Sequence, residues 1–416
     1  MNHCGVSGWA LVRRHALAKL ATRAGRGRSC APSSRRCAWQ VACSWTIEAP
    51  GTRPRVRCAG SRRIAGEKLE QRLHTLTRAS MGQDVGSDDD DVMMPMPQAS
   101  VIDVAGEPTE MLESVSPIRS KPALEVVVFP GNPGSGHFYE HYTKYLHKTL
   151  VDKVGCVRVR TLSHLGHVKG IYKPSFYTLE DQVEHKLNFL QEYCNDAETP
   201  LLVVGHSIGA YMALEAVKRW QASRKAARRT TRSESKHKHP SDTCRIMAQM
   251  PYMQFDESSS KQLSLERVAK RPYIPAAVAG FINLVVPNFV LVRVLTAFDK
   301  NLEKESARHV AEQLLSYTVG HNAFSLAQDE FKTLRGKEID WTWLRGNRER
   351  VGWVFCPGDH WAPQKLYEQV VENLGEDKTC FIKYREDQFH GFVTSKLACK
   401  RMASLTEEFL TNFREN

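Results

Sequence analysis

The stretch that most constrains the fold is LLVVGHSIGAYMALEAVKRW, residues 201–220. Its first half is apolar and rich in Leu and Val, which predicts a buried strand, and its second half has the spacing of a helix. Between them, residues 205–209 fit the pattern G-x-S-x-G. This pattern places a serine on a sharp strand-to-helix turn at the carboxyl edge of a sheet, and the glycines avoid collisions there. We therefore expect Ser207 to be a nucleophile.

The chain before this turn alternates between strand and helix patterns. The run Leu124–Phe129 is typical of a buried parallel strand, and residues 137–150 have aromatic and leucine residues at helical spacing. A short strand pattern begins at Val157, and residues 179–194 predict an amphipathic helix. Residues 101–113 predict an edge hairpin that turns at residues 106–108. The sequence thus predicts an α/β protein with a mostly parallel central sheet flanked by helices.

A serine hydroxyl needs a base and an orienting acid to act as a nucleophile near neutral pH. Downstream, Asp359 follows a predicted strand over residues 352–356, and His390 follows another over residues 380–384. Both lie just beyond a strand end, at the same edge of the sheet as Ser207. We assign Asp359 as the orienting acid and His390 as the general base.

Two neighbouring residues compete for these roles. His360 follows Asp359 directly and is expected to face outward. Asp387 lies so close to His390 in sequence that it is poorly placed to hold the far ring nitrogen.

An oxyanion formed during acyl transfer needs two backbone N–H donors. One is expected from Ile208, the residue after the serine, and the other from Asn132 in the loop PGNPG, residues 130–134. Pro130 and Pro133 restrict this loop because proline fixes φ. The alternative interpretation of the loop is an ordinary turn.

Several motifs together resemble the lipid droplet-associated hydrolases, a branch of the α/β-hydrolase superfamily. They are VVFPGNPGSGHFYEHY, LSHLGH, QVEHKLNFL, GHSIGAY, CPGDHWAP and FHGFV. The resemblance implies the α/β-hydrolase fold with a helical cap or lid insertion, and Ser207, Asp359 and His390 as its triad. It also implies association with lipid droplets and hydrolysis of sterol or other lipid esters.

The resemblance covers the chain from about residue 124 onward and suggests a division into parts. Residues 1–98 are expected to be a largely disordered basic extension and acidic linker, and residues 99–416 the α/β-hydrolase domain. Within that domain we expect a cationic loop insert at residues 221–242 and an apolar helical cap at residues 255–345.

The formal net charge of +12 is confined to the beginning of the chain. Residues 1–80 contain 16 Lys and Arg against 3 Asp and Glu, so the remaining residues carry a net charge of −1. The main body is therefore nearly neutral, and we expect no nucleic-acid partner. Residues 1–80 resemble a plastid or mitochondrial transit peptide, or they precede a true start at Met81 as an upstream extension.

Residues 272–295 are strongly apolar, with Arg293 as their single charged residue. They are long enough to span a membrane, but Pro275, Gly280, Asn283 and Pro287 are expected to divide them into short helices. A hairpin that enters the phospholipid monolayer of a lipid droplet fits better, and an apolar lid over the site is a compatible alternative. The cationic insert at residues 221–242 would add attraction to anionic headgroups, or is an ordinary solvated loop.

No dinucleotide or phosphate-binding loop is found, so no cofactor is expected. His164 and His167 suggest metal ligands by type only, since no third and fourth ligand accompanies them, and no metal is expected. The sequence predicts a serine hydrolase that acts on lipid esters at lipid droplets, with the endoplasmic reticulum as a second location. The alternative is a droplet-surface binding or scaffold protein with little or no turnover.

Overall fold

The computed structural model describes residues 95–116, 121–171, 176–231, 239–299, 301–375 and 379–411. Almost all of the basic extension predicted for residues 1–98, including the possible transit peptide, lies outside these ranges. The described residues all belong to one compact unit, residues 43–416.

Eight strands of the described chain form one sheet in the order β1-β2-β4-β3-β5-β6-β7-β8. The hairpin β1–β2 is antiparallel, β2 is antiparallel to β4, and all other neighbours are parallel. Their bounds are β1 Gln98–Val104, β2 Glu107–Val115, β3 Leu124–Phe129, β4 Val157–Leu162, β5 Leu201–His206, β6 Arg245–Gln249, β7 Val351–Phe355 and β8 Phe381–Tyr384.

The predicted buried strands are confirmed, and the predicted hairpin turn starts one residue and ends two residues too late. β3 and β5 are buried along their whole length, as their uninterrupted apolar runs indicate. The hairpin turns at Ala105 and Gly106, which both have positive φ, and the Asp103 side chain accepts a hydrogen bond from the Gly106 amide at 2.8 Å. Pro108 was predicted to belong to the turn, but it pairs with Asp103 inside the antiparallel ladder.

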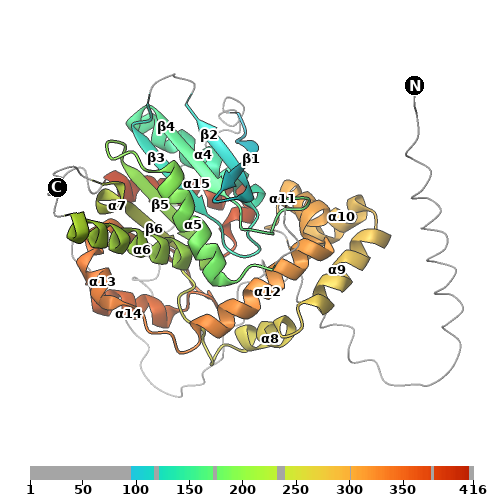
Figure 1. Cartoon of the computed structure of the whole chain (residues 1–416). Helices are drawn as coiled ribbons and strands as arrows, with labels where there is room; N and C mark the ends of the chain where they lie inside the picture. Colours follow the sequence, from blue (N-terminus) through green and yellow to red (C-terminus); the bar gives the residue numbers. More distant parts are fainter. Residues whose placement is uncertain are drawn as a thin grey trace, which may run out of the picture. The chain divides into compact units, whose positions relative to one another are not determined.

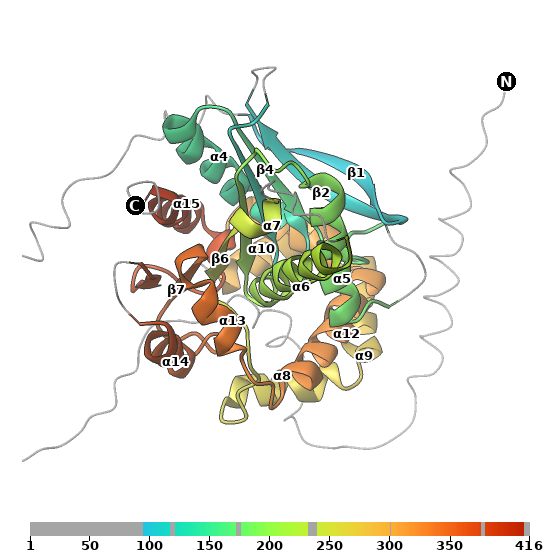
Figure 2. The same cartoon turned by 60° about the vertical axis from the view of Figure 1, so that its left-hand side comes forward.

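Helices cover both faces of the sheet, with α4 and α15 on one face and α5 and α6 on the other (Figures 1 and 2). Helix α5 starts with a capping box, in which Thr178 and Asp181 satisfy each other's amides. The bounds are η2 Gly136–Tyr139, α4 Glu140–Val154, α5 Leu179–Tyr193, α6 Ile208–Thr231, α7 Pro240–Thr243, η4 Arg348–Arg350, α14 Gln364–Leu374, η5 Phe392–Thr394 and α15 Lys396–Thr411.

The prediction of a loop at residues 221–242 is wrong for the first half of this segment. Helix α6 continues without interruption to Thr231, because Ala, Lys and Arg in this part of the sequence are good helix formers. Residues 232–238 lie outside the described ranges. The short helix α7 follows, and Gln221 on α6 donates to the carbonyl of Ser241 on α7 at 2.9 Å.

Helices fill the region between β6 and β7, which contains the cap, residues 255–345 (Figure 1). They are α8 Ser260–Ala269, α9 Tyr273–Val285, α10 Asn288–Phe298, α11 Lys304–His309, the π-helix η3 Val310–Leu314, α12 Tyr317–Leu334 and α13 Trp341–Gly346. The apolar segment 272–295 is divided at Pro287, as predicted, but Gly280 and Asn283 do not interrupt α9, and Pro275 lies in its first turn, where proline is tolerated. Within the described ranges, no helix is both long and apolar enough to cross a bilayer.

The inner faces of α9 and α10 are packed against the rest of the cap. Gly280 lets α9 approach α12 closely, because a Cβ atom there would lie 3.2 Å from the Cβ of Tyr317. The Asn283 side chain donates to the carbonyl of Ala311, and a small apolar core forms around Leu291. The two helices are therefore held to the protein on one side only.

Candidate active site

Ser207 lies on the turn between β5 and α6, with a φ of 54°. A positive φ costs free energy in a residue other than glycine, so the surrounding hydrogen bonds must hold it. The Ser207 amide donates to the carbonyl of Gln249 at 3.0 Å, and the Ser207 carbonyl accepts from the Tyr252 amide at 3.1 Å. The end of β6 thus fixes the strained turn from both sides.

The glycines around the turn are required by close backbone approach. A Cβ atom on Gly205 would lie 2.4 Å from the Cα atom of Ala210, and one on Gly209 would lie 2.2 Å from the carbonyl oxygen of Phe129. In the loop 130–134, a Cβ atom on Gly131 would lie 2.9 Å from the Cβ atom of Ser207. The loop after β3 therefore lies directly against the serine.

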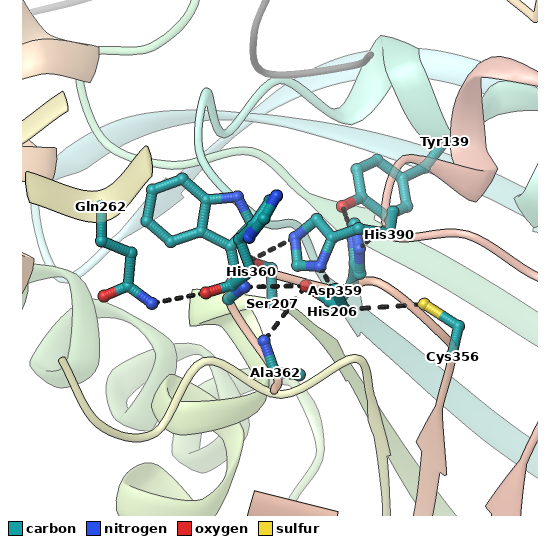
Figure 3. Close-up of polar contacts among 10 residues, drawn as sticks. Tyr139, His206, Ser207, Gln262, Cys356, Asp359, His360, Ala362 and His390 are labelled. Atoms are coloured by element: carbon teal, nitrogen blue, oxygen red, sulfur yellow. Dashed lines mark hydrogen bonds and ion pairs between the residues drawn. The ribbon is translucent and has the colours of Figure 1, made fainter. Parts of the chain in front are cut away.

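The structure brings Ser207, Asp359 and His390 together although they are far apart in sequence (Figure 3). The His390 Nε2 atom lies 3.0 Å from Ser207 Oγ, and the His390 Nδ1 atom lies 2.7 Å from Asp359 Oδ2. A carboxylate can only accept, so Nδ1 carries the proton and Nε2 accepts from the serine hydroxyl. Asp359 follows β7 and His390 follows β8, at the same edge of the sheet as Ser207.

Asp359 is fully buried but remains ionised. Burial alone would raise the pKa of its carboxyl group, but the charge and hydrogen bond of His390 and two backbone amides together hold this pKa below its usual value. Its Oδ1 atom accepts from the amides of Trp361 and Ala362 at 2.8 and 3.1 Å, and its Oδ2 atom lies 3.7 Å from Cys356 Sγ. These contacts leave the Asp359 side chain in one orientation.

The two competing residues have other partners. The Asp387 carboxylate forms ion pairs with Arg385 at 2.9 Å and Arg401 at 3.6 Å. His360 is half-buried, and its backbone carbonyl accepts a hydrogen bond from Gln262. His390 and Asp359, rather than His360 and Asp387, therefore form the pair in which an acid orients a base.

The amides of Ile208 and Asn132 lie on the two segments that meet at Ser207. Within the described part of the chain, neither amide donates a hydrogen bond to another residue. The neighbouring Gly131 amide is different, because it donates to the Tyr139 hydroxyl at 2.7 Å. Ile208 begins helix α6, where the helix dipole also favours negative charge.

The sequence did not indicate that the cap holds the Asn132 side chain. The Asn132 Nδ2 atom donates to the carbonyl of Ala323 and to Glu330 Oε1, each at 3.0 Å. Both partners lie on α12. Burial raises the pKa of the Glu330 carboxyl group to about 8, so this side chain is largely neutral at pH 7.

His164 and His167 support the loop 130–134. The His167 Nδ1 atom donates to the carbonyl of Pro133 at 2.6 Å, and the His164 amide donates to the carbonyl of Gly134 at 2.8 Å. Burial lowers the pKa of both imidazoles, that of His167 to about 4. Among the described residues, no group of three His, Cys, Asp or Glu side chains is placed to hold a metal ion.

Comparison with known proteins identifies the family of this chain. A sequence model of the lipid-droplet associated hydrolase family matches residues 122–393. A lipid droplet-associated hydrolase of Gallus gallus is 28% identical over 306 residues, which cover 70% of this chain and 86% of the relative. One of Drosophila melanogaster is 24% identical, covering 60% of this chain and 77% of the relative.

The fold comparison gives the same class. A solved carboxylesterase structure from Nitrososphaera gargenis has a TM-score of 0.50 and 15% identity, covering 76% of this chain and 100% of the other. The predicted α/β-hydrolase fold is thus confirmed. Because the family match extends from β3 through His390 and includes the serine turn, the chain belongs to the lipid-droplet associated hydrolase family.

Proposed function

We propose that this protein is a serine hydrolase of lipid carboxylic esters, with sterol esters or other neutral-lipid esters as substrates. The observation that carries the proposal is the pair of hydrogen bonds that joins Ser207 to His390 and His390 to Asp359, at 3.0 and 2.7 Å. A serine hydrogen-bonded to an imidazole, with a buried carboxylate behind it, is the arrangement used for acyl transfer.

The first half of the reaction forms an acyl-enzyme. Ser207 Oγ attacks the ester carbonyl carbon while its proton moves to His390 Nε2, and the carbonyl electron pair moves onto oxygen. The amides of Ile208 and Asn132 stabilise this oxyanion. When the tetrahedral intermediate collapses, the alcohol leaves and takes the proton from His390. Asp359 stabilises the imidazolium that exists between these two transfers.

The second half returns the enzyme to its starting state. His390 removes a proton from water, and the resulting hydroxide attacks the acyl carbon. The intermediate expels Ser207 Oγ, which regains its proton from His390, and the carboxylic acid is released. No cofactor is needed for these steps.

The preference for apolar substrates is supported by the outer surface of α9 and α10. The side chains that face away from the cap are large, apolar and exposed, with Phe281 at 57% and Phe289 at 66%. We name this surface the apolar face, and its residues are Tyr273, Ile274, Val278, Phe281, Leu284, Val285, Phe289 and Phe298. A monomeric soluble protein rarely exposes so many large apolar side chains on two adjacent helices.

The same surface supports docking to the phospholipid monolayer of a lipid droplet. Two short helices joined at Pro287 can lie in the interface without crossing it. Exposed Lys270 and Arg271 shortly precede α9, and exposed Arg293 lies on α10; we expect these cations to contact anionic headgroups. Related proteins are named for lipid droplets, so we propose this location, with the endoplasmic reticulum as a second one.

Hydrolysis of emulsified esters tests the proposal. Purified protein is incubated with cholesteryl oleate and trioleoylglycerol emulsions, and released oleate is measured for the wild type and for Ser207→Ala. The proposal expects release by the wild type and at least about a 10³-fold loss in the variant. Equal release by the two proteins would reject Ser207 as the nucleophile.

A scaffold protein with little turnover is the second candidate, favoured by the apolar face because membrane docking requires no catalysis. The two candidates differ in turnover. An enzyme releases fatty acid at droplets in a Ser207-dependent manner, whereas a scaffold binds droplets equally well with and without Ser207 and releases none. Imaging of fusions with and without residues 1–80 tests the further alternative of plastid or mitochondrial targeting.

A further inference from the structure

A buried network of hydrogen bonds connects the loop 130–134, the serine turn and the loop that carries the base. The Gly131 amide donates to the Tyr139 hydroxyl at 2.7 Å. This hydroxyl lies 2.6 Å from His206 Nδ1 (Figure 3). The other ring nitrogen of His206, Nε2, lies 2.8 Å from the backbone carbonyl oxygen of His390. Neither Tyr139 nor His206 belongs to the triad.

The donor and acceptor of each hydrogen bond follow from the last acceptor in the series, the His390 carbonyl. A carbonyl oxygen can only accept, so His206 Nε2 carries a proton and donates to His390. His206 Nδ1 is then the acceptor of a neutral imidazole, and the Tyr139 hydroxyl donates to it. The Tyr139 oxygen in turn accepts from the Gly131 amide. In these three hydrogen bonds, every donor therefore has an acceptor.

Burial keeps the side chains of Tyr139 and His206 in this single protonation state. Tyr139 and His206 are both buried, and the rings of Phe392 and His206 pack in a T-shaped arrangement. Burial lowers the pKa of His206 to about 3 and raises the pKa of the Tyr139 hydroxyl, so both stay neutral across the physiological range.

We propose that Tyr139 and His206 are positioning residues for catalysis, which set the backbone of His390 and of the loop 130–134 relative to Ser207. The inference rests on the proposed hydrolase function. His206 is covalently next to Ser207, so its bond to the His390 carbonyl ties the nucleophile and the base directly to each other. Because the Tyr139 hydroxyl accepts the hydrogen bond of the Gly131 amide, the next amide, that of Asn132, becomes the oxyanion donor of this loop.

Two replacements of His206 separate its two contacts. The amide nitrogen of glutamine reaches the position of His Nε2, whereas the side chain of asparagine ends near Nδ1. His206→Gln therefore retains the donor to the His390 carbonyl, and His206→Asn removes it. Because a lost buried hydrogen bond that acts in the transition state costs roughly 10-fold to 100-fold in rate, we expect that loss in kcat for His206→Asn, with KM little changed. His206→Gln is expected to recover most of it.

Tyr139→Phe removes one oxygen atom and is expected to lower kcat roughly 10-fold. Thr143→Val is the matched control, because Thr143 lies on α4 close to Tyr139 in sequence and its buried hydroxyl bonds the hydroxyl of Thr161 on β4 at 2.7 Å. The control is expected to lower the melting temperature about as much as Tyr139→Phe and to leave kcat unchanged.

Steady-state kinetics on a soluble short-chain ester and thermal melts of the full chain give the readouts. The inference is overturned if Tyr139→Phe and Thr143→Val have equal kcat, or if His206→Gln loses as much kcat as His206→Asn. It is also overturned if kcat falls only in proportion to folded protein. A wild type without esterase activity rejects the proposed function and this inference with it, whereas an active wild type with equally active variants rejects the inference alone.

Discussion

The side chain of Asn132 is bound to the carboxyl group of Glu330 at 3.0 Å, so the loop with a proposed oxyanion donor is attached to helix α12 of the cap. Glu330 is buried, and this raises the pKa of its carboxyl group to about 8. The charge of Asp329 raises this pKa further, and the neighbouring buried Tyr252 hydroxyl is neutral. We therefore expect the protonation of this buried acid to affect both stability and catalysis.

The first prediction concerns stability against pH. An unfolded glutamate ionises near pH 4.3, whereas folded Glu330 holds its proton to about pH 8. The folded state therefore binds more protons between these values, and its stability falls as pH rises from about 4.3 to 8. Glu330→Gln keeps the acceptor for Asn132 without this penalty. We expect it to raise the free energy of unfolding at pH 8 by about 2 to 4 kcal/mol.

Urea unfolding at pH 5 and pH 8 measures this effect. The exposed Glu368, which bonds Gln364 on α14, provides a matched control, and Glu368→Gln should leave the free energy of unfolding within about 0.5 kcal/mol at both pH values. A Glu330→Gln protein that is less stable than the wild type at pH 8 would contradict the prediction.

A second prediction concerns the rate. When Glu330 ionises above about pH 8, a negative charge arises next to Asn132 and opposes the oxyanion. The kcat of the wild type is expected to decline above that pH, and the kcat of Glu330→Gln to decline less. Identical pH profiles of kcat between pH 6 and 10 would show that Glu330 does not act on the oxyanion.

The sequence predicted those features that depend on local pattern. Buried parallel strands such as β3 and β5 are continuous apolar runs, and Asp359 and His390 follow strand ends, so the sheet topology alone brings them to one edge. Contacts across the fold leave no such pattern. Asn132 and Glu330 are 198 positions apart, and helical periodicity shows that α12 buries one face without showing which loop it meets.

The end of helix α6 was also predicted incorrectly. Helix α6 was expected to end near residue 221 because the following charges suggested a solvated loop, yet those residues are strong helix formers. His206 gave no signal beyond its place in the G-x-S-x-G pattern. Its role depends on Tyr139 and on a carbonyl 184 positions away, which only the three-dimensional structure brings together.

The third prediction tests the close approach at the serine turn. In Gly209→Ala the new Cβ atom would lie 2.2 Å from the carbonyl oxygen of Phe129, and the fixed end of β3 cannot move away. We expect a loss of at least about 3 kcal/mol in the free energy of unfolding. Gly346→Ala, at the end of α13 with no atom within 4 Å of its Cβ position, should be neutral or slightly stabilising. Equal stability of the two variants by denaturant unfolding would contradict the expected clash.

The fourth prediction separates the two candidate acids. Asp359→Asn leaves the shape of the site but favours the wrong tautomer of His390, so kcat should fall about 10³-fold to 10⁴-fold with little change in KM. Asp387→Asn only weakens ion pairs with Arg385 and Arg401, and its kcat should stay within about 2-fold of the wild type. Steady-state kinetics on a soluble ester would contradict the assignment if Asp387→Asn were the more damaged enzyme.

The fifth prediction tests docking by the apolar face. Phe281→Ser combined with Phe289→Ser removes two exposed rings, each expected to contribute about 1 kcal/mol to monolayer binding, so the affinity for artificial lipid droplets should fall roughly 10-fold to 100-fold. Activity on a soluble ester should not change. Leu397→Ser, which alters an equally exposed residue on α15, is the control and should bind normally. Flotation with droplets measures the bound fraction, and unchanged flotation of the double variant would place the docking surface elsewhere.

The most direct test of the central claim is covalent labelling of Ser207. A fluorophosphonate reacts with a serine only when a neighbouring base activates it, and mass spectrometry of peptides identifies the modified residue. The account predicts a single adduct on Ser207, absent from Ser207→Ala and strongly slowed in Asp359→Asn and His390→Ala. Labelling of Ser207→Ala at the rate of the wild type, or no adduct on the folded wild type, would contradict it.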